Sequence, residues 1–378
     1  MEKYDFAIIG SGLFGSVFAR YVSDIGKSVI MFEKRDHIGG NCYDEIRDNI
    51  PVSLYGPHSF HCPDKKTWDY VNKFSQFNNF MLRPKVKYND KIYSFPINLM
   101  TLHQLWGVNT PEEAELALDK VRIPCENPRN LEEWILSQVG EEIYETFIRH
   151  YTTRQWNKPP SELPASIIKR LPIRLIFNDS HYPDSHIYQG VPVNGYAAMF
   201  NKMLEGIEIH INSDFFLDRR GIEAIAETIV YTGPLDELFG HCHGPLEYRS
   251  LRFEHEKLSG DYQGTAIVNY TGPCNIFTRI SEWKHFYGIK SDITHITREY
   301  PAEYSDTKEA YYPLRDDKNT ILYKKYRDMA DQNDNLILGG RLAEYTYMDM
   351  NMVVASAMSM ANNTLWSRMN GNRKITRG

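Results

Sequence analysis

The chain begins with an apolar run, residues 4–9, that leads directly into the glycine-rich turn Gly10-Ser-Gly12-Leu-Phe-Gly15. A strand, a Gly-x-Gly-x-x-Gly turn and a helix in this order are typical of dinucleotide-binding folds. Gly10 permits the tight turn, Gly12 lets a pyrophosphate approach the backbone, and Gly15 lets the helix pack closely on the strand. We therefore predict a helix over residues 16–24, with helix N-terminal amides that bind phosphate.

A second apolar run, residues 28–33, ends on Glu33, which lies 18 residues beyond Gly15, where an acid is expected to bind a ribose hydroxyl. Gly39 and Gly40 follow closely. A Gly-Gly pair at this distance is typical of flavoproteins, because a second backbone segment without side chains can then approach the cofactor. FAD is therefore favoured over NAD, and the alternative is a glycine-rich turn in an ordinary α/β protein.

The overall composition limits the classes of function. The formal net charge of −6 over 378 residues gives no reason to expect nucleic acid or an anionic membrane as a partner. Five scattered cysteines without C-x-x-C spacing indicate a reducing compartment, so we expect a cytoplasmic protein without a metal site. No apolar run reaches roughly 18 residues and the chain starts on its first strand, so neither a membrane span nor a signal peptide is expected.

The pattern of apolar residues changes along the chain from helical spacing before residue 170 to alternation over residues 250–325. We predict an α/β fold with a discontinuous FAD-binding Rossmann-like domain, an inserted helical bundle and an antiparallel β-sheet domain. The expected divisions are 1–65, 212–245 and 330–378 for the FAD-binding domain, 66–170 for the mainly helical domain with a mobile loop at its end, and 171–211 and 246–329 for the substrate-binding sheet.

No serine–histidine–acid triad, carboxylate pair or metal-ligand motif stands out, which predicts that a cofactor performs the difficult chemical step. Arginine offers a planar fork of donors suited to phosphate. Each arginine alone is more often a surface ion pair, but four in apolar or aromatic company favour an anion site: Arg174, Arg249, Arg279 and Arg341. Tyr151 and Trp156 are either core residues at a helix end or a stacking platform.

Seven segments together resemble the bacterial UDP-galactopyranose mutase family, and the resemblance covers nearly the whole chain. The matching segments are residues 10–15, 34–41, 55–61, 163–170, 188–196, 246–251 and 339–345. The resemblance implies an FAD-binding Rossmann-like domain, a helical bundle and an antiparallel sheet, usually in a homodimer.

The same resemblance implies the reaction. Members of the family contract the ring of a nucleotide-linked pyranose to the furanose form, which is used for cell-surface glycans, without net redox change. In this family N5 of reduced FAD forms a covalent adduct with the sugar and displaces UDP, so the nucleophile belongs to the cofactor. The expected partners are therefore a nucleotide sugar and an external reductant for the FAD, either NADPH or a flavin reductase.

Roles for individual residues also follow from the resemblance. Arg174, on a mobile loop, and Arg279 bind the diphosphate and offset the charge of the leaving UDP. The remaining catalytic residues lie beside the flavin or the substrate: His58, His61 and Asp349. FAD is bound by Gly10, Gly12, Phe14, Gly15, Glu33, Lys34, Gly40, Asn41, Arg249, Gly340 and Arg341. The substrate is bound by Tyr151, Trp156, Arg174, Tyr188, Arg279, Tyr312, Tyr347 and Leu82.

Departures from the family pattern leave the sugar open. Leu82 stands where typical galactose mutases have an asparagine, and it favours a sugar without a hydroxyl there, because a buried hydroxyl without a partner is penalised. Residues 184–188 also belong to a loop two residues longer than usual. UDP-N-acetylgalactopyranose, dTDP-fucopyranose and UDP-arabinopyranose are therefore alternative substrates. An FAD-dependent oxidoreductase of the amine-oxidase type and a non-catalytic binding protein are the alternative functions.

Overall fold

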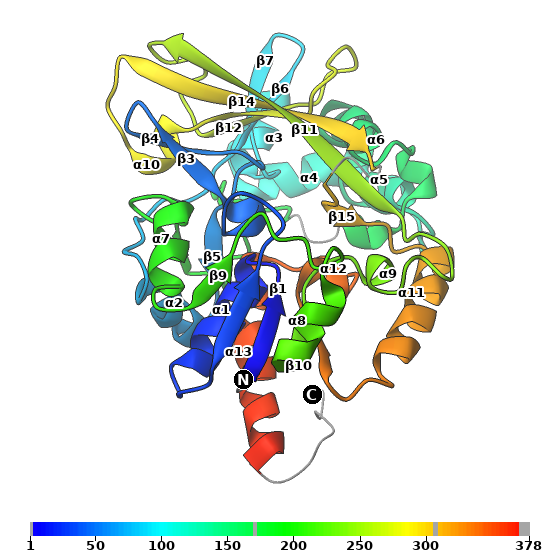
Figure 1. Ribbon diagram of the computed structural model, residues 1–378. Helices are drawn as coiled ribbons and strands as arrows, with labels where there is room; N and C mark the ends of the chain where they lie inside the picture. Colours follow the sequence, from blue (N-terminus) through cyan, green and yellow to red (C-terminus); the bar gives the residue numbers. More distant parts are fainter. Residues whose placement is uncertain (1–2, 169–171, 305–308, 370–378) are drawn as a thin grey trace.

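The computed structural model of the protein describes residues 3–168, 172–304 and 309–369. Figure 1 shows two tiers, a parallel sheet below and a larger sheet above, with a group of helices beside the upper sheet. The strand order in the lower sheet is β16-β10-β1-β2-β9, and all its strands are parallel. These strands are β1 (Tyr4–Ile9), β2 (Val29–Phe32), β9 (Glu208–His210), β10 (Ala226–Tyr231) and β16 (Leu336–Leu338).

Helices cover both faces of the parallel sheet. Alternate residues of β1 face opposite sides, so Phe6 and Ile8 join one apolar core while Ala7 and Ile9 join another. The first core is completed by α1 (Leu13–Ser23), α2 (Lys65–Asn72), α7 (Tyr196–Met203) and α13 (Met350–Met369). The second is completed by α8 (Arg219–Ile225), α9 (Leu235–Leu238), α11 (Asp317–Ala330) and α12 (Gly340–Ala343).

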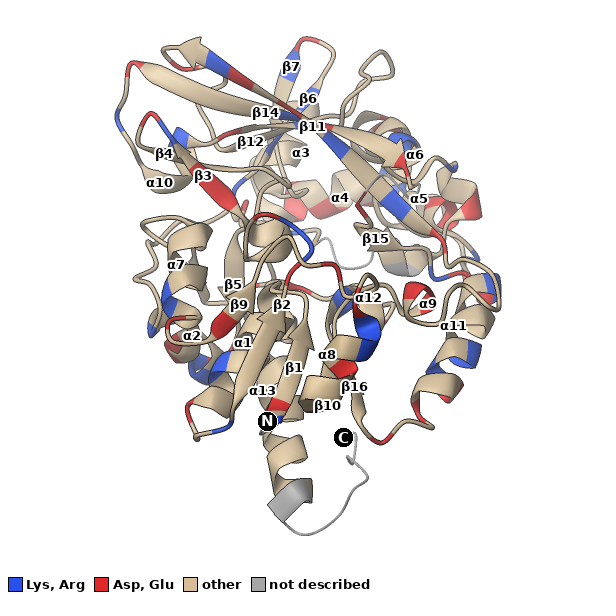
Figure 2. Ribbon diagram, in the orientation of Figure 1, with Lys and Arg blue, Asp and Glu red and all other residues tan. Residues whose placement is uncertain are grey.

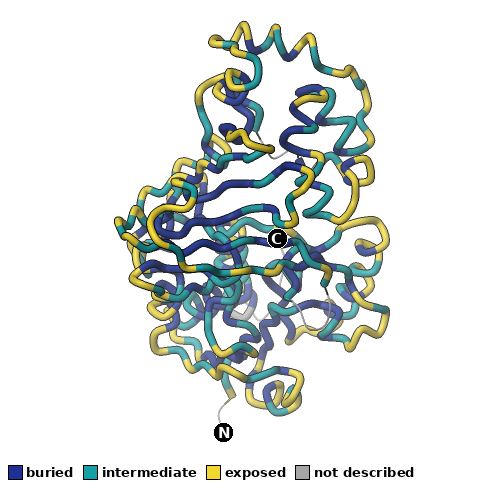
Figure 3. The backbone as a smooth tube through the Cα atoms, turned by 90° about the horizontal axis from the view of Figure 1, so that it is seen from above, coloured by how far each residue is buried: buried dark blue, intermediate teal, exposed yellow. Residues whose placement is uncertain are grey.

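The upper sheet is antiparallel except where β12 runs parallel to β6. Its strands, in spatial order, are β15 (Tyr312–Pro313), β11 (Tyr248–Ser259), β14 (Ile293–Glu303), β13 (Arg279–Glu282), β12 (Ile267–Tyr270), β6 (Lys85–Tyr88) and β7 (Lys91–Ser94). Viewed from above in Figure 3, buried residues run along strands in the middle, and exposed residues gather in the surrounding loops. Two short strand pairs lie outside the two main sheets: β3 (Asp44–Arg47) with β4 (Ile50–Ser53), and β5 (Phe60–Cys62) with β8 (Tyr188–Gly190), which packs into the first core of the parallel sheet. One short helix, α10 (Lys284–Tyr287), follows β13.

The helical group has its own apolar core. Local signals define several of its ends. Pro111 occupies the first position of α4, and the Thr110 hydroxyl accepts a hydrogen bond from the Glu113 amide, so Thr110 is the N-cap. Gly140 has a non-helical backbone, with φ of +76°, and interrupts the helical run of residues 131–149. The elements are α3 (Leu99–Trp106), α4 (Pro111–Val121), α5 (Leu131–Ile143), the π-helix Tyr144–Arg149 and α6 (His150–Trp156).

The structure corrects several predicted boundaries. Helix α1 begins at Leu13 rather than Ser16, because the helical backbone starts directly after Gly12. The β6–β7 hairpin belongs to the upper sheet rather than the helical part, while β9, α7 and α11 belong with the parallel sheet. Short alternating runs predict a strand without identifying its neighbour, so the sequence does not say which sheet β6, β7 and β9 join. Residues 169–171 of the predicted mobile loop lie outside the described residues, and the division into three domains stays a prediction.

Candidate functional site

The glycine-rich turn forms an open cradle at the start of α1. Gly10 has φ of +99° and its amide donates to the Phe32 carbonyl at 2.8 Å, which fixes the turn between β1 and β2. A Cβ atom on Gly12 would meet nothing within 4 Å, so space is left beside this backbone. A Cβ on Gly40 would lie 2.9 Å from the Gly12 Cα, so the second glycine segment closes on the first. These backbones and the α1 N-terminus fit a pyrophosphate.

Glu33 lies at the end of β2 beside this cradle and is 5% exposed. Its Oε2 accepts hydrogen bonds from the Ser11 amide at 2.8 Å and the Ser11 hydroxyl at 2.7 Å, while Oε1 accepts one from the Arg35 amide at 3.0 Å. The Arg35 guanidinium in turn donates to Asn41 Oδ1 at 2.9 Å. A buried, fully oriented carboxylate at this point suits a ribose hydroxyl, whereas Lys34 is exposed. Ser11 and Arg35 were not predicted.

The start of α12 closes the cradle from the other side. A Cβ on Gly339 would lie 2.0 Å from the Phe14 ring, and one on Gly340 would lie 3.2 Å from the Phe14 Cβ. Arg341 follows directly on α12. Burial, and then the positive charge of Arg341, lower the pKa of His58 to about 4, so this imidazole is neutral at neutral pH. Phe14, Gly340, Arg341 and His58 therefore belong to one neighbourhood, and their roles toward FAD and the substrate stay predictions.

A second set of residues, which we call the Arg279 cluster, consists of Tyr151, Arg279, Glu299, Tyr312 and Tyr347. Strands β13 and β14 place Arg279 directly opposite Glu299. Arg279 Nε lies 3.1 Å from Glu299 Oε1, and Arg279 Nη2 donates to the Tyr151 hydroxyl at 3.1 Å. Burial opposes the charge on Arg279, but the Glu299 carboxylate outweighs it and raises the pKa of the guanidinium above its usual value. The cluster therefore holds a permanent cation in a fixed direction.

Aromatic rings extend this cluster. The Tyr312 ring stacks on that of Tyr347, with centroids 6.3 Å apart, and lies 6.4 Å from Trp156. Burial raises the pKa of Tyr312, so its hydroxyl keeps its proton and can donate to an anion. Trp156 also packs against the helical core, so it is both a core residue and a wall of the site. Arg249 is 7% exposed, and its Nε donates to the Gln155 carbonyl at 3.3 Å. Gln155 precedes Trp156 at the end of α6.

His61 forms a third part of the site, on β5. Its Nε2 lies 3.9 Å from Asp349 Oδ2, just before α13, and its Nδ1 lies 2.6 Å from Nδ1 of His186. The ring stacks on Tyr182, with centroids 3.5 Å apart. Burial is the main reason that the pKa of His61 falls to about 4, although Asp349 acts in the opposite direction. The resemblance gave His61 and Asp349 as residues beside the flavin or the substrate, whereas Tyr182 and His186 were not predicted.

Tyr182 links these parts. Its hydroxyl donates to the Ser59 carbonyl at 3.2 Å, and it interacts electrostatically with Tyr347, Asp349 and Arg279. Tyr182 belongs to the connecting segment, residues 172–187, which runs from the helical part to β8. No regular spacing marks this segment in the sequence. The aromatic and imidazole side chains between Arg174 and Tyr188 are the one sequence feature that could have identified this segment as part of the site.

Arg174 lies on the same segment but in a different setting from the one predicted. Its guanidinium is 7% exposed and donates to the Ser180 carbonyl at 2.8 Å, the Tyr182 carbonyl at 2.9 Å and Asp184 Oδ1 at 2.8 Å. Among the described residues, none of its hydrogen bonds reaches the Arg279 cluster. The two arginines expected at one diphosphate are therefore held by different partners.

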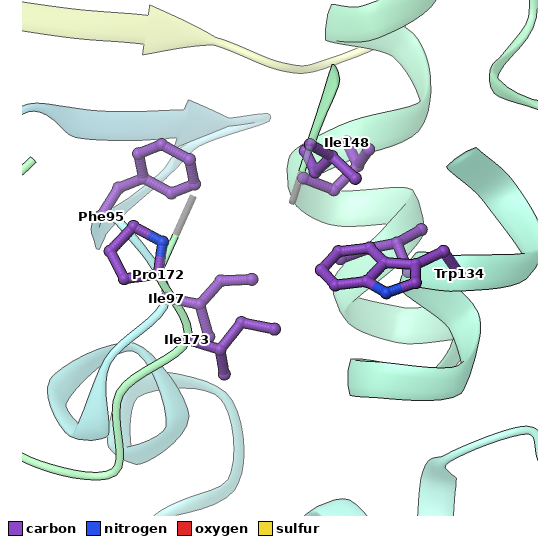
Figure 4. A pocket seen from close by; sticks show the side chains of 8 residues that line it. Phe95, Ile97, Trp134, Ile148, Pro172 and Ile173 are labelled. Carbon is purple, nitrogen blue, oxygen red and sulfur yellow. The ribbon is translucent and has the colours of Figure 1, made fainter. Parts of the chain in front are cut away.

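The connecting segment starts beside an apolar cavity. Figure 4 shows Pro172 and Ile173 on one side of this cavity, with side chains of the helical part across from them. The side chains labelled there are Phe95, Ile97, Trp134, Ile148, Pro172 and Ile173. Because small apolar cavities leave their linings short of packing contacts, the base of the segment has room to change its packing.

Two predicted substrate-binding residues lie elsewhere. Tyr188 pairs with Cys62 on β5, so it faces the opposite side from His61, and its ring stacks on Trp68 with centroids 5.7 Å apart. Leu82 is 7% exposed and belongs to an apolar cluster against which Tyr182 also packs. Leu82 thus lies behind Tyr182, and its predicted contact with the sugar stays a prediction.

One group of potential metal ligands, Asp261, Glu282 and His285, comes together in the upper sheet. Its chemistry argues against a bound cation. Glu282 is fully buried, and its two oxygens accept hydrogen bonds from the amides of residues 262 and 263 and from the Thr294 hydroxyl. The Lys284 ammonium lies 3.0 Å from Asp261 and already neutralises that carboxylate. We regard this group as structural.

Charged residues are distributed rather than segregated. Figure 2 shows lysines and arginines interspersed with acidic residues over both tiers. The described part of the chain contains no helix with the length and apolar character needed to cross a membrane.

Comparisons with known proteins agree with this arrangement. The family model described as UDP-galactopyranose mutase matches residues 146–347, and one for an NAD(P)-binding Rossmann-like domain matches residues 8–74. A probable UDP-galactopyranose mutase of Klebsiella pneumoniae is 36% identical over 98% of this chain and 97% of its own length. A dTDP-fucopyranose mutase of Escherichia coli is 33% identical over 94% of this chain and 96% of its own length.

Solved structures show the same fold. The crystal structure of a reduced UDP-galactopyranose mutase superposes with a TM-score of 0.75 and 14% identity, and covers 97% of this chain and 96% of that one. A putrescine oxidase superposes less well, with a TM-score of 0.60 and 12% identity, over 97% of this chain and 99% of that one. With its dinucleotide cradle, its Arg279 cluster and these full-length relatives, the chain belongs to the UDP-galactopyranose mutase family and is an isomerase of the mutase type.

Proposed function

We propose that this chain is a flavin-dependent mutase that converts a nucleotide-linked pyranose, UDP-galactopyranose or a close variant, into its furanose form for cell-surface glycan synthesis. The Arg279 cluster is the observation that carries the proposal. It combines a permanent cation with tyrosine hydroxyls and aromatic rings, which suits a diphosphate joined to a base and a sugar.

The cofactor in this proposal is FAD, held by the cradle at Gly12, Gly40 and Gly340 and by Glu33. The open space at Gly12 and the buried, oriented Glu33 carboxylate fit a dinucleotide. Reduced FAD supplies the nucleophile for the anomeric carbon, and an external reductant, NADPH or a flavin reductase, keeps it reduced. A nucleophile supplied by the cofactor agrees with a site whose protein groups are suited to binding and proton transfer.

The protein groups have separate tasks in the proposal. Arg279 binds the diphosphate and offsets the negative charge that develops on the leaving nucleotide. Arg174 joins it only after exchanging its three partners on the connecting segment for the diphosphate. His61, which its low pKa keeps neutral at neutral pH, transfers protons near the sugar, and Asp349 lies beside it. Replacing either arginine with alanine should therefore lower turnover, and unchanged turnover would contradict its role.

The identity of the sugar stays open between related pyranoses. Relatives named for UDP-galactopyranose and dTDP-fucopyranose are 36% and 33% identical to this chain. In this proposal Leu82 contacts the sugar and favours a deoxy or hydrogen-only position there, because its apolar side chain offers no hydrogen-bond partner. A 6-deoxy sugar or a pentose is therefore the leading variant, with UDP-N-acetylgalactopyranose as a further alternative. A cytoplasmic homodimer is also proposed, on family resemblance.

The proposal is tested by anaerobic turnover with dithionite-reduced holoenzyme. UDP-galactose, UDP-N-acetylgalactosamine, UDP-arabinose and dTDP-fucose are each followed by anion-exchange chromatography and proton NMR. A furanose product that appears only with reduced flavin supports the proposal and ranks the sugars. An absence of interconversion, together with substrate-dependent reduction of the oxidised flavin, would instead support an oxidoreductase of the amine-oxidase type.

A further inference from the structure

The most specific contact in the site that the proposed mechanism leaves unused joins two imidazole rings. Nδ1 of His61 and Nδ1 of His186 are 2.6 Å apart. At this separation one nitrogen must carry the proton and the other must present its lone pair, because two protons or two lone pairs would repel. The contact therefore selects one protonation pattern for the pair.

The other end of His61 decides the direction of this hydrogen bond. Its Nε2 lies 3.9 Å from the Asp349 carboxylate. A proton on Nε2 interacts favourably with that carboxylate, whereas a lone pair there is repelled. A neutral His61 has only one ring proton, and burial keeps this ring neutral at neutral pH. The proton is thus favoured on Nε2, which leaves Nδ1 to accept from His186.

The backbone around His186 is held so that this contact can persist. The His186 amide donates to the Pro183 carbonyl at 2.9 Å, and the Gln189 side-chain amide donates to the His186 carbonyl at 3.0 Å. Gln189 pairs with His61 across β8 and β5, so the strand pairing itself brings the end of the connecting segment to His61. Tyr182 covers the His61 ring from one face.

We propose that His186 is a positioning residue that holds His61 in the tautomer with its proton on Nε2, directed toward Asp349. The connecting segment, which also carries Arg174, thereby controls both a phosphate-binding cation and the proton position of a site histidine. The catalytic consequence rests on the proposed mutase function, but the hydrogen bond does not. A side chain that cannot donate at this position leaves only the Asp349 carboxylate, 3.9 Å from Nε2, to favour this tautomer of His61.

The direct test is nitrogen NMR of the oxidised holoenzyme labelled with ¹⁵N-histidine, which needs no turnover. The variant His61→Gln assigns the signals of His61. At neutral pH, we expect the wild-type protein to show a protonated Nε2 and an unprotonated Nδ1. We expect His186→Phe to shift both His61 nitrogens toward averaged values, because the Asp349 contact of 3.9 Å alone favours one tautomer less strongly than it does together with the His186 hydrogen bond. Ser185→Ala, a change of an exposed neighbour, should leave the spectrum unchanged.

Two results would overturn the inference. One is a protonated Nδ1 on His61 in the wild-type protein, and the other is an unchanged His61 spectrum in His186→Phe. If His186→Phe does not fold, His186→Asn decides, because its amide can still donate and should keep the wild-type tautomer. An averaged His61 spectrum in a folded His186→Asn variant contradicts the proposal.

Kinetics then separate positioning from simple structural support. In the proposed sugar-mutase reaction, His186→Phe should lower kcat by about 10-fold to 100-fold with little change in KM, as for residues that orient a functional histidine. It should also alter the pH profile of kcat, and His186→Asn should restore part of the rate. A lower kcat with an unchanged pH profile, accompanied by a lower free energy of unfolding, would contradict a positioning role. If every mutase assay fails, the NMR result still tests the hydrogen bond between His186 and His61 by itself.

Discussion

Arg279 and Arg174 are the two arginines predicted to bind one diphosphate, yet the fold holds them in contrasting ways. Arg279 lies on a strand in a sheet and faces Glu299, which is 3% exposed. Arg174 lies on the connecting segment, and its carboxylate partner, Asp184, is 64% exposed. The first is fixed by long-range pairing of β13 with β14, and the second by groups at most ten residues away in its own segment. Arg279 is thus preorganised by the sheet, whereas the proposed function requires Arg174 to exchange its partners.

The largest expected effect breaks the preorganised pair. Arg279→Met leaves the buried Glu299 charge without its partner, so we expect the free energy of unfolding to fall by about 2 to 4 kcal/mol. Turnover should fall by about 100-fold or more, since an oriented cation at the diphosphate is lost. Chemical denaturation and the anaerobic assay measure the two effects.

The double variant Arg279→Met with Glu299→Gln is the matched control. It also removes the unpaired Glu299 charge, so it should recover most of the free energy of unfolding without recovering turnover. A double variant as unstable as the single one would show that packing, rather than the ion pair, causes the loss.

Acid should next weaken the part of the site that contains His61. Its pKa in the folded protein is about 4, below the unfolded value, so the unfolded chain binds more protons between roughly pH 6.5 and 4. Above that pH window His61 costs the fold nothing. As pH falls through the window, the free energy of unfolding decreases by about 3 kcal/mol at most. Denaturation of the wild type and His61→Gln across pH 4 to 8 should show a smaller acid loss in the variant. Parallel curves would contradict the burial argument.

A smaller effect is expected at the nucleotide cradle. Glu33→Gln keeps the shape of the side chain but removes the charge that accepts two bonds from Ser11. A hydrogen bond to a charged group contributes about 1.5 to 3 kcal/mol, so the Kd for FAD should rise by about tenfold or more. Flavin fluorescence during dialysis measures the change. Lys34→Ala, at an exposed neighbour, is the control, and equal FAD retention by all three proteins would disprove the role of Glu33.

The smallest expected effect tests the exchangeable arginine. Asp184→Asn removes an exposed partner of Arg174, so stability should change by less than about 1 kcal/mol. UDP should bind up to about fivefold more tightly, because Arg174 is then easier to release toward the diphosphate. Calorimetric titration of the reduced holoenzyme with UDP measures this change, with Ser185→Ala as the control. Weaker binding would mean that Asp184 holds Arg174 in its binding position.

The cradle and the Arg279 cluster differ in how far the sequence predicted them. The turn at Gly10, the acid at Glu33 and the return of a late glycine turn at Gly340 were all predicted, because each rests on spacing along one short segment. The π-helix, the break at Gly140 and the placement of β9 were missed, since they depend on packing between distant segments.

The same contrast holds within the site. Tyr151, Tyr312 and Tyr347 were predicted to lie near Arg279 through family resemblance, while Glu299 was not singled out. Glu299 lies in an alternating strand where an inward-facing acid looks like any other polar position, and only the register of β14 against β13 places it opposite Arg279.

The sequence by itself determined the nucleotide-binding sheet, the family and the types of side chain available for chemistry. Those features follow from local periodicity, from glycine's freedom at the turns and from motif spacing. Only the tertiary structure decided that Glu299 fixes Arg279, that Tyr182 and His186 meet His61, and that Arg174 is held by its own segment. These contacts depend on strand register and on the path of an irregular segment, and neither leaves a periodic signal in the order of residues.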